Sequence, residues 1–189
     1  YALRLKTNAR RGGRVEDIIL ADSVMDHVHG AAVHGTMLYE DGRNGSDLPV
    51  FHNITIENII AHGGDYGIFL EAFDEVPVTG LTLRNIRIDG VVRPMRSMNW
   101  KEPVVDDVII NGKSFPRPGG VRILGVPVNG ETVKAEARAC GGDMDFMYSW
   151  QTATDGAAWK QAGQGEQFPV PGTADFIRVT VTDHKGNTE

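Results

Sequence analysis

Cysteine, long apolar runs and helix signals are all scarce in this sequence. Its 189 residues include one cysteine, Cys140, which excludes an intrachain disulfide framework. No window approaches the roughly 18 consecutive apolar residues that a membrane-spanning helix needs. Helix caps and apolar stripes at helical spacing are missing as well, whereas the sequence contains 23 glycines. These features favour a turn-rich all-β protein, because glycine weakens helices and serves tight turns.

Positive charge is concentrated at the start of the chain, although the net charge is −6. The acidic balance argues against a general nucleic-acid binder. In an extended strand Leu3 and Leu5 share one face, and Arg4 and Lys6 share the other. We therefore expect a buried apolar row backed by an exposed pair of cations. Further basic residues follow before the first acidic residue, Glu16: Arg10, Arg11 and Arg14.

Four segments repeat one pattern, in which a turn-forming residue precedes two aliphatic residues at positions i and i+2. They are VEDIILADSV (15–24), FHNITIENII (51–60), VTGLTLRNIR (78–87) and VDDVIINGKS (105–114). The first aliphatic residues are 36, 27 and 27 positions apart, and the surplus in the first interval fits a loop at 34–49, rich in Gly and Asp. We expect these aliphatic residues to line one interior column: Ile18, Ile54, Leu81 and Val108.

The repeats predict stacked strands. Their period-2 alternation indicates short strands, and their close succession without crossover helices indicates a parallel β-helix. In that architecture each coil stacks on the previous one and buries a continuous aliphatic column. Short polar residues at one repeat position should form a ladder at a turn, where their side chains hydrogen-bond the backbone. This predicted ladder consists of Asp22, Asn58, Asn85 and Asn111.

A second module follows the repeats. The Pro- and Gly-rich stretch GKSFPRPGG indicates a linker, which we place at 116–120. Beyond it, short alternating runs separated by Asn-Gly and Asp-Gly turns are typical of a β-sandwich at 121–189. We expect Trp150 in its core and Ile177, Val179 and Val181 in one inward row. The stretches YSWQTATDGAAW and IRVTVT resemble bacterial immunoglobulin-like modules.

The first 118 residues resemble the C-terminal half of the polygalacturonase family of pectin-degrading glycoside hydrolases. The resemblance is carried by ALRLKTN, RGGRVEDI, YEDG (39–42), FHNITIENI and GIFLEAFDEVPVTGLTLRNIRI. It implies a right-handed parallel β-helix at 1–115 and inverting hydrolysis of α-linked galacturonan. In that family an Arg-Ile-Lys strand binds the uronate carboxylate, and Arg4 and Lys6 match it, with Leu5 in place of Ile. A cleft tyrosine of the family matches Tyr39.

The catalytic residues of that family do not have counterparts in this chain. The Asn-Thr-Asp, Asp-Asp and Gly-His-Gly motifs precede the Arg-Ile-Lys strand, so we expect catalysis upstream and an inactive isolated chain. His29 and His34 follow that strand and lack the preceding glycine, so we expect neither to be catalytic. We expect no cofactor and no metal. Structural or surface roles are expected for the carboxylates available here: Asp22, Asp26, Asp65, Glu71 and Asp74.

Two other interpretations stay open at this point. One is a non-catalytic β-helix that binds acidic polysaccharide, as an adhesin or carbohydrate-binding module. The other is a pectate lyase, which needs calcium-binding acidic clusters and an Arg base. In each case the expected partner is an acidic polysaccharide, not nucleic acid.

The chain begins at Tyr1 without an initiator methionine or signal peptide, so we expect a piece of a longer protein, with any targeting segment upstream. The resemblance implies an extracellular or periplasmic location. We also expect self-association through the exposed end of the truncated β-helix, because an uncapped coil presents apolar side chains and unpaired strand edges.

Overall fold

The computed structural model describes residues 1–40, 42–141, 144–184, 186 and 188. None of these residues belongs to a helix, so none forms a helix that could cross a membrane. The chain divides into two compact units. The first comprises Tyr1–Pro116 and Cys140–Asp143, and the second comprises Arg117–Ala139 and Met144–Glu189.

The first unit is built from two sheets. Sheet A has the strand order β1-β3-β5-β7 and is entirely parallel, and sheet B has the order β2-β4-β6-β8-β9, in which only the β8–β9 pair is antiparallel. Sheet A consists of β1 (Leu3–Lys6), β3 (Ala31–Thr36), β5 (Tyr66–Glu71) and β7 (Arg93–Met98). Sheet B consists of β2 (Arg14–Met25), β4 (Val50–His62), β6 (Thr79–Asp89), β8 (Val104–Ile110) and β9 (Lys113–Phe115).

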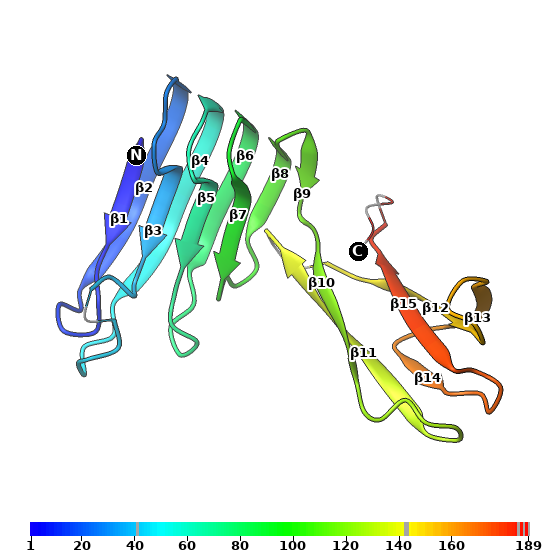
Figure 1. The fold of residues 1–189 in the computed structure, drawn as a ribbon. Coiled ribbons are helices and arrows are strands. Elements are labelled where there is room, and N and C mark those ends of the chain that lie inside the picture. Colours follow the sequence, from blue (N-terminus) through cyan, green and yellow to red (C-terminus); the bar gives the residue numbers. More distant parts are fainter. Residues whose placement is uncertain (41, 142–143, 185, 187, 189) are drawn as a thin grey trace. The chain divides into compact units, whose positions relative to one another are not determined.

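The chain visits the two sheets alternately, so each coil adds one strand to sheet A and the next to sheet B (Figure 1). Parallel pairing of every coil with the next follows from this path, because each strand runs in the direction of its predecessor. The arrangement is that of an all-β protein with parallel sheets, consistent with a parallel β-helix. The loop expected at 34–49 starts only after Thr36, since His34–Thr36 complete β3.

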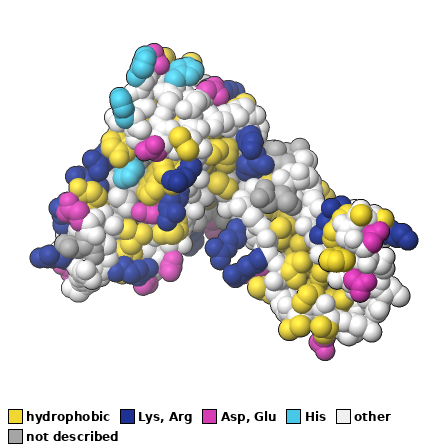
Figure 2. Space-filling model, in the orientation of Figure 1, with side chains coloured by type: hydrophobic (Ala, Val, Ile, Leu, Met, Phe, Trp, Pro, Cys, Tyr) yellow, Lys and Arg dark blue, Asp and Glu magenta, His cyan; other side chains and the backbone are white. Residues whose placement is uncertain are grey.

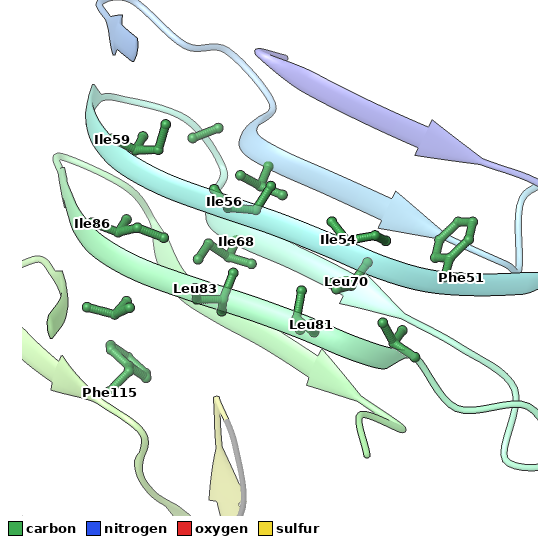
Figure 3. Close-up of a cluster of buried hydrophobic side chains, with 14 of the residues drawn as sticks. Phe51, Ile54, Ile56, Ile59, Ile68, Leu70, Leu81, Leu83, Ile86 and Phe115 are labelled. Carbon is green, nitrogen blue, oxygen red and sulfur yellow. The ribbon is translucent and has the colours of Figure 1, made fainter. Parts of the chain in front are cut away.

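The core lies between the sheets and is aliphatic. In Figure 3, Ile54 and Ile56 of β4 and Leu81 and Leu83 of β6 lie near Ile68 and Leu70 of β5. All six side chains are at most 2% exposed. Burying a side chain of this size typically stabilises a fold by about 1.5–3 kcal/mol, so the stacked columns hold the coils together.

The register of sheet B confirms three members of the predicted column and corrects the fourth. Ile18, Ile54 and Leu81 are aligned as the sequence predicted. Val108 instead pairs with Ile86, so the expected alignment of Val108 with Leu81 is wrong by five residues. Val108 still faces the core, with 1% exposure.

Three members of the predicted polar ladder are joined, but they lie within strands and bond one another through their side chains, where the sequence predicted bonds to the backbone at a turn. Asn58 Nδ2 donates to Asp22 Oδ1 at 2.7 Å, and Asn85 Nδ2 donates to Asn58 Oδ1 at 2.9 Å. In the β6–β8 register Arg84 pairs with Asp106 and Ile86 with Val108, which places Asp107, not Asn111, opposite Asn85. Positive φ angles between 48° and 55° occur at all four aligned positions, Asp22, Asn58, Asn85 and Asp107. Asn and Asp tolerate this conformation better than other side chains. Asn111 instead bonds the backbone of Val91 through both amide atoms.

β1 and β2 are edge strands within the described residues, and their inward side chains are less covered than those of later coils. Ile18 and Leu20 are partly buried, whereas Ile54 and Ile56, their partners in β4, are 1% and 0% exposed. The column of inward side chains is therefore partly exposed to solvent at β2.

The second unit consists of two three-stranded sheets, ordered β10-β11-β14 and β13-β12-β15. Trp150 and Phe168 belong to one buried cluster, against which Ile177 and Val179 pack, and Val181 is also buried. The Trp150 ring stacks on Phe168 at 5.0 Å, and its Nε1 donates to the Gly165 carbonyl. The strands are β10 (Arg117–Leu124), β11 (Thr132–Cys140), β12 (Met147–Ala153), β13 (Lys160–Gln164), β14 (Gln167–Pro169) and β15 (Phe176–Thr182). Residues 117–120, which the sequence indicated as linker, lie in β10.

Candidate functional site

The first strand of sheet A separates apolar from basic side chains. Leu3 and Leu5 are partly buried and pack against the core, whereas Arg4 and Lys6 are exposed. This is the alternation that the sequence predicted for an extended strand. The backbone of β1 pairs with β3, so both cations project from a hydrogen-bonded sheet.

Tyr39 reaches this pair of cations because the residues after β1 bind its backbone. The Tyr39 amide donates to the Thr7 carbonyl at 3.1 Å, and Asn8 Nδ2 donates to the Tyr39 carbonyl at 3.1 Å. Thr7 and Asn8 are themselves buried, with 5% and 1% exposure. Asn8 Oδ1 also accepts from the amides of Arg10 and Arg11, which fixes the turn that carries Arg11.

Three cations surround the Tyr39 ring. The Lys6 ammonium lies 4.3 Å from the ring centroid, and the guanidinium carbons of Arg4 and Arg11 lie 5.7 Å from it. These distances are within the range of cation–π attraction, which stabilises the packing of cations that would otherwise repel one another. Sequence reasoning identified Arg4, Lys6 and Tyr39, and it missed Arg11 as a neighbour and Asn8 as the residue that positions the turn.

The charges of Arg4 and Lys6 are not neutralised within the described part of the chain. Neither side chain lies within 4 Å of a described carboxylate oxygen, whereas Arg11 lies 3.5 Å from Glu40 and Arg43 bonds Glu75. In Figure 2, Lys and Arg side chains lie beside hydrophobic ones over the face of the first unit in view. Two adjacent uncompensated cations beside an aromatic ring form a suitable site for an anionic group.

His34 lies next to Arg4 in the sheet, in direct register with it. Its ring stacks on Phe69 at 4.8 Å and meets the edge of Tyr1 at 5.0 Å. Burial, and then the positive charge of Arg4, hold the pKa of His34 below its ordinary value, against an opposing contribution from Glu71. Its Nδ1 is buried and has no hydrogen-bond partner among the described residues.

A hydrogen-bond network continues the site on the next three strands of sheet A, β3, β5 and β7. The Thr36 hydroxyl donates to Glu71 Oε1 at 2.9 Å and accepts from the Leu38 amide at 2.9 Å, next to Tyr39. Arg96 Nε donates to Glu71 Oε2 at 2.9 Å. Glu71 is only 8% exposed, so both of its oxygens are satisfied by the protein.

Three of the other candidate carboxylates have polar side-chain partners, and Asp65 takes part through its backbone, which accepts from the Arg93 amide at 2.9 Å. Asp22 belongs to the polar ladder, Asp74 accepts from Asn99 Nδ2 at 2.7 Å, and Asp26 lies 3.2 Å from His27. Among the residues that the structure describes, no three His, Cys, Asp or Glu side chains are grouped to hold a metal ion. His29 is exposed and precedes β3, away from the strand register that joins Arg4 to His34.

The lowered pKa of His34 predicts one component of acid destabilisation. A pKa that is lower in the folded than in the unfolded state means that the unfolded chain binds more protons, so stability falls as pH drops through about 6.5. We expect His34→Phe, which keeps the stacked ring, to show a smaller loss of melting temperature between pH 7.5 and 5.0 than the wild type. The measurement is thermal unfolding by circular dichroism, with His62→Gln as a matched control. An equal loss in His34→Phe and wild type would show that His34 does not contribute.

Comparison with known proteins gives one similar solved structure. No protein-family model matches the chain, and no curated protein matches it. The crystal structure of a hyperthermoactive exopolygalacturonase from Thermotoga maritima is similar to it, with 26% sequence identity and a TM-score of 0.49. The similarity covers 59% of this chain and 25% of the other, so this chain matches about a quarter of that protein's length.

Proposed function

We propose that the first unit binds the uronate carboxylates of α-linked galacturonan, as part of an inverting glycoside hydrolase of the polygalacturonase type. The observation that carries the proposal is the exposed pair Arg4 and Lys6, fixed on β1 without a described carboxylate partner and packed around Tyr39. The sequence motifs that resemble the polygalacturonase family include the same three residues.

The chemistry of these side chains suits a carboxylate on a sugar ring. A planar guanidinium binds both oxygens of a carboxylate with two parallel hydrogen bonds, and an ammonium adds a point charge beside it. An aromatic ring next to them offers an apolar surface to the sugar. Because β1 is hydrogen-bonded to β3, little conformational freedom of the backbone is lost on binding.

Hydrolysis belongs to the longer protein in this proposal. Inversion requires a carboxylic acid that protonates the leaving oxygen and a carboxylate that activates water, about 6.5–9.5 Å apart. Glu71, the most buried carboxylate near Arg4 and Lys6, has both oxygens engaged with Thr36 and Arg96. We assign it a structural role and place the catalytic acids outside this chain.

The proposal extends to the fold and location in finer detail. The coils of the first unit are right-handed, the second unit is an accessory immunoglobulin-like module, and the protein acts outside the cell or in the periplasm. The open column at Ile18 and Leu20 supports self-association of the isolated chain.

The test is calorimetric titration of the purified chain with tetragalacturonate and with an uncharged galactose oligomer of the same length. We expect heat of binding with the acidic ligand alone, and affinity that falls as salt rises, because the site is solvent-exposed. A reducing-sugar assay on the same sample should show no hydrolysis. Equal affinity for both ligands would contradict the proposed recognition of the carboxylate, and hydrolysis abolished by mutating a carboxylate of this chain would contradict the placement of the catalytic acids.

A further inference from the structure

A continuous series of ring contacts crosses sheet A from the proposed carboxylate site. The Arg4 guanidinium lies 4.6 Å from the Tyr1 ring, Tyr1 meets His34 at 5.0 Å, and His34 stacks on Phe69 at 4.8 Å. Phe69 meets Tyr66 at 5.1 Å. The series thus runs from β1 over β3 to β5. We call it the ring track, defined by Tyr1, His34, Phe69 and Tyr66.

Two arginines of β7 lie at the far end of the ring track. Arg96 lies 5.5 Å from the Phe69 ring, and its charge is compensated by Glu71 at 2.9 Å. Arg93 lies 5.3 Å from the Tyr66 ring, is exposed, and forms no ion pair with a described carboxylate. Its Nη1 donates to the Tyr66 hydroxyl at 2.9 Å, which anchors the guanidinium while leaving other donors available.

The two uncompensated positions are separated by a distance that only an oligomer can span. β1 and β7 are three strand spacings apart, about 14 Å, and Arg93 precedes by three residues the position in register with Arg4, about 10 Å along the strand. A single sugar ring cannot contact both ends. The aromatic side chains between them present apolar surface of the kind that sugars pack against.

We infer that Arg93, anchored by Tyr66, is a second carboxylate-binding position and that the ring track guides an acidic oligosaccharide to it from Arg4 and Lys6. The inference rests on the proposed function of the first site. It assigns β7 a role in selecting long acidic oligosaccharides over short ones. A short ligand bound at Arg4 and Lys6 does not reach Arg93, so Arg93 adds nothing to its affinity.

The experiment compares the affinity of digalacturonate and hexagalacturonate for the purified chain by calorimetry. Arg93→Gln should lower the affinity for the hexamer by about fivefold, the size expected for one exposed ion pair, and leave the affinity for the dimer unchanged. Tyr66→Phe keeps the ring but removes the anchoring hydroxyl, and should give a smaller loss for the hexamer alone. Arg84→Gln is the matched control, since Arg84 lies in sheet B between Glu57 and Asp106.

The outcomes distinguish a failure of the second carboxylate position from a failure of the first site. If Arg4→Ala weakens both ligands and Arg93→Gln weakens only the hexamer, the inference is supported. If Arg93→Gln behaves like Arg84→Gln while Arg4→Ala still weakens both ligands, the second position is wrong and the first site stands. If neither ligand binds the wild type, or Arg4→Ala has no effect, both claims are wrong. Circular dichroism melts of every variant identify any loss that comes from unfolding.

Discussion

Replacing Arg4 by alanine should weaken binding of tetragalacturonate by about 10- to 150-fold. This range corresponds to the loss of a hydrogen-bonding partner for a charged group, about 1.5–3 kcal/mol. Lys6→Ala should cause a loss in the same range, because the carboxylate then keeps only the guanidinium. The measurement is the dissociation constant from calorimetric titration, with a thermal melt of each variant to show that the fold is intact.

Two substitutions on the same strand sharpen this prediction. Arg4→Lys should recover only part of the lost affinity, since an ammonium cannot reproduce two parallel hydrogen bonds to a carboxylate. Leu5→Ile should be nearly neutral, because Leu5 packs against the core and the exchange conserves volume. If Arg4→Ala melts earlier than the wild type but binds tetragalacturonate normally, Arg4 is a structural residue and the carboxylate role is wrong.

Replacing Ile54 by alanine should destabilise the first unit by about 2–5 kcal/mol, the usual cost of truncating a fully buried isoleucine. Ile54 is 1% exposed and lies between Ile18 and Leu81 in the sheet register, so its removal leaves a cavity inside the stack. Ile18→Ala removes the same atoms from the same column, yet it should cost less than half as much, because Ile18 is only partly buried at the edge strand.

Urea unfolding of the two variants measures this difference. Both substitutions lie in the first unit, so both should shift the same transition, and the second unit's transition should not move. Ile54→Val provides the conservative control, with an expected cost of about 0.5–1.5 kcal/mol. Equal destabilisation by Ile54→Ala and Ile18→Ala would contradict the edge position of β2.

The strands of sheet B were predictable because apolar residues alternate within each half of a strand, but the register between the strands was only partly predictable. Each long strand carries two inward pairs, Leu81 with Leu83 and Ile86 with Ile88 in β6, with Asn85 between them. Asn85 has positive φ, so the alternation changes phase there and both pairs face the core. By its pattern, the pair Val108 and Ile110 of β8 could align with Leu81 and Leu83 or with Ile86 and Ile88. Only the observed pairing of β8 with β6 shows that it aligns with Ile86 and Ile88.

The strands of sheet A after β1 were missed for a different reason. β3 is buried almost throughout its length, and β7 contains a proline, so neither shows clean alternation. Among β3, β5 and β7, only β5 shows an alternation that indicates a strand, with Ile68 and Leu70 two residues apart. Since His34 and Arg93 depend on β3 and β7 for their positions, sequence reasoning could not bring them to the same face as Arg4.

The residues of the proposed site were easier to predict from the sequence than the residues that surround them. The exposure of Arg4 and Lys6 follows from strand geometry alone, and the structure places Tyr39 beside them. The contact itself depends on two hydrogen bonds of the Tyr39 backbone, its amide donating to the Thr7 carbonyl and its carbonyl accepting from Asn8 Nδ2, which no local pattern predicts. Coil stacking creates this contact, because it brings residues more than thirty positions apart onto adjacent strands and turns.

The central claim is that Arg4 recognises the carboxylate of the sugar, and a comparison of tetragalacturonate with its methyl ester tests it most directly. Esterification removes the charge and leaves the rest of the ligand unchanged. The claim predicts that Arg4→Ala weakens binding of the acid by about 10- to 150-fold and binding of the ester by no more than about twofold, so the effects of the two changes are strongly non-additive. If Arg4→Ala weakens acid and ester equally, Arg4 does not bind the carboxylate and the account is contradicted.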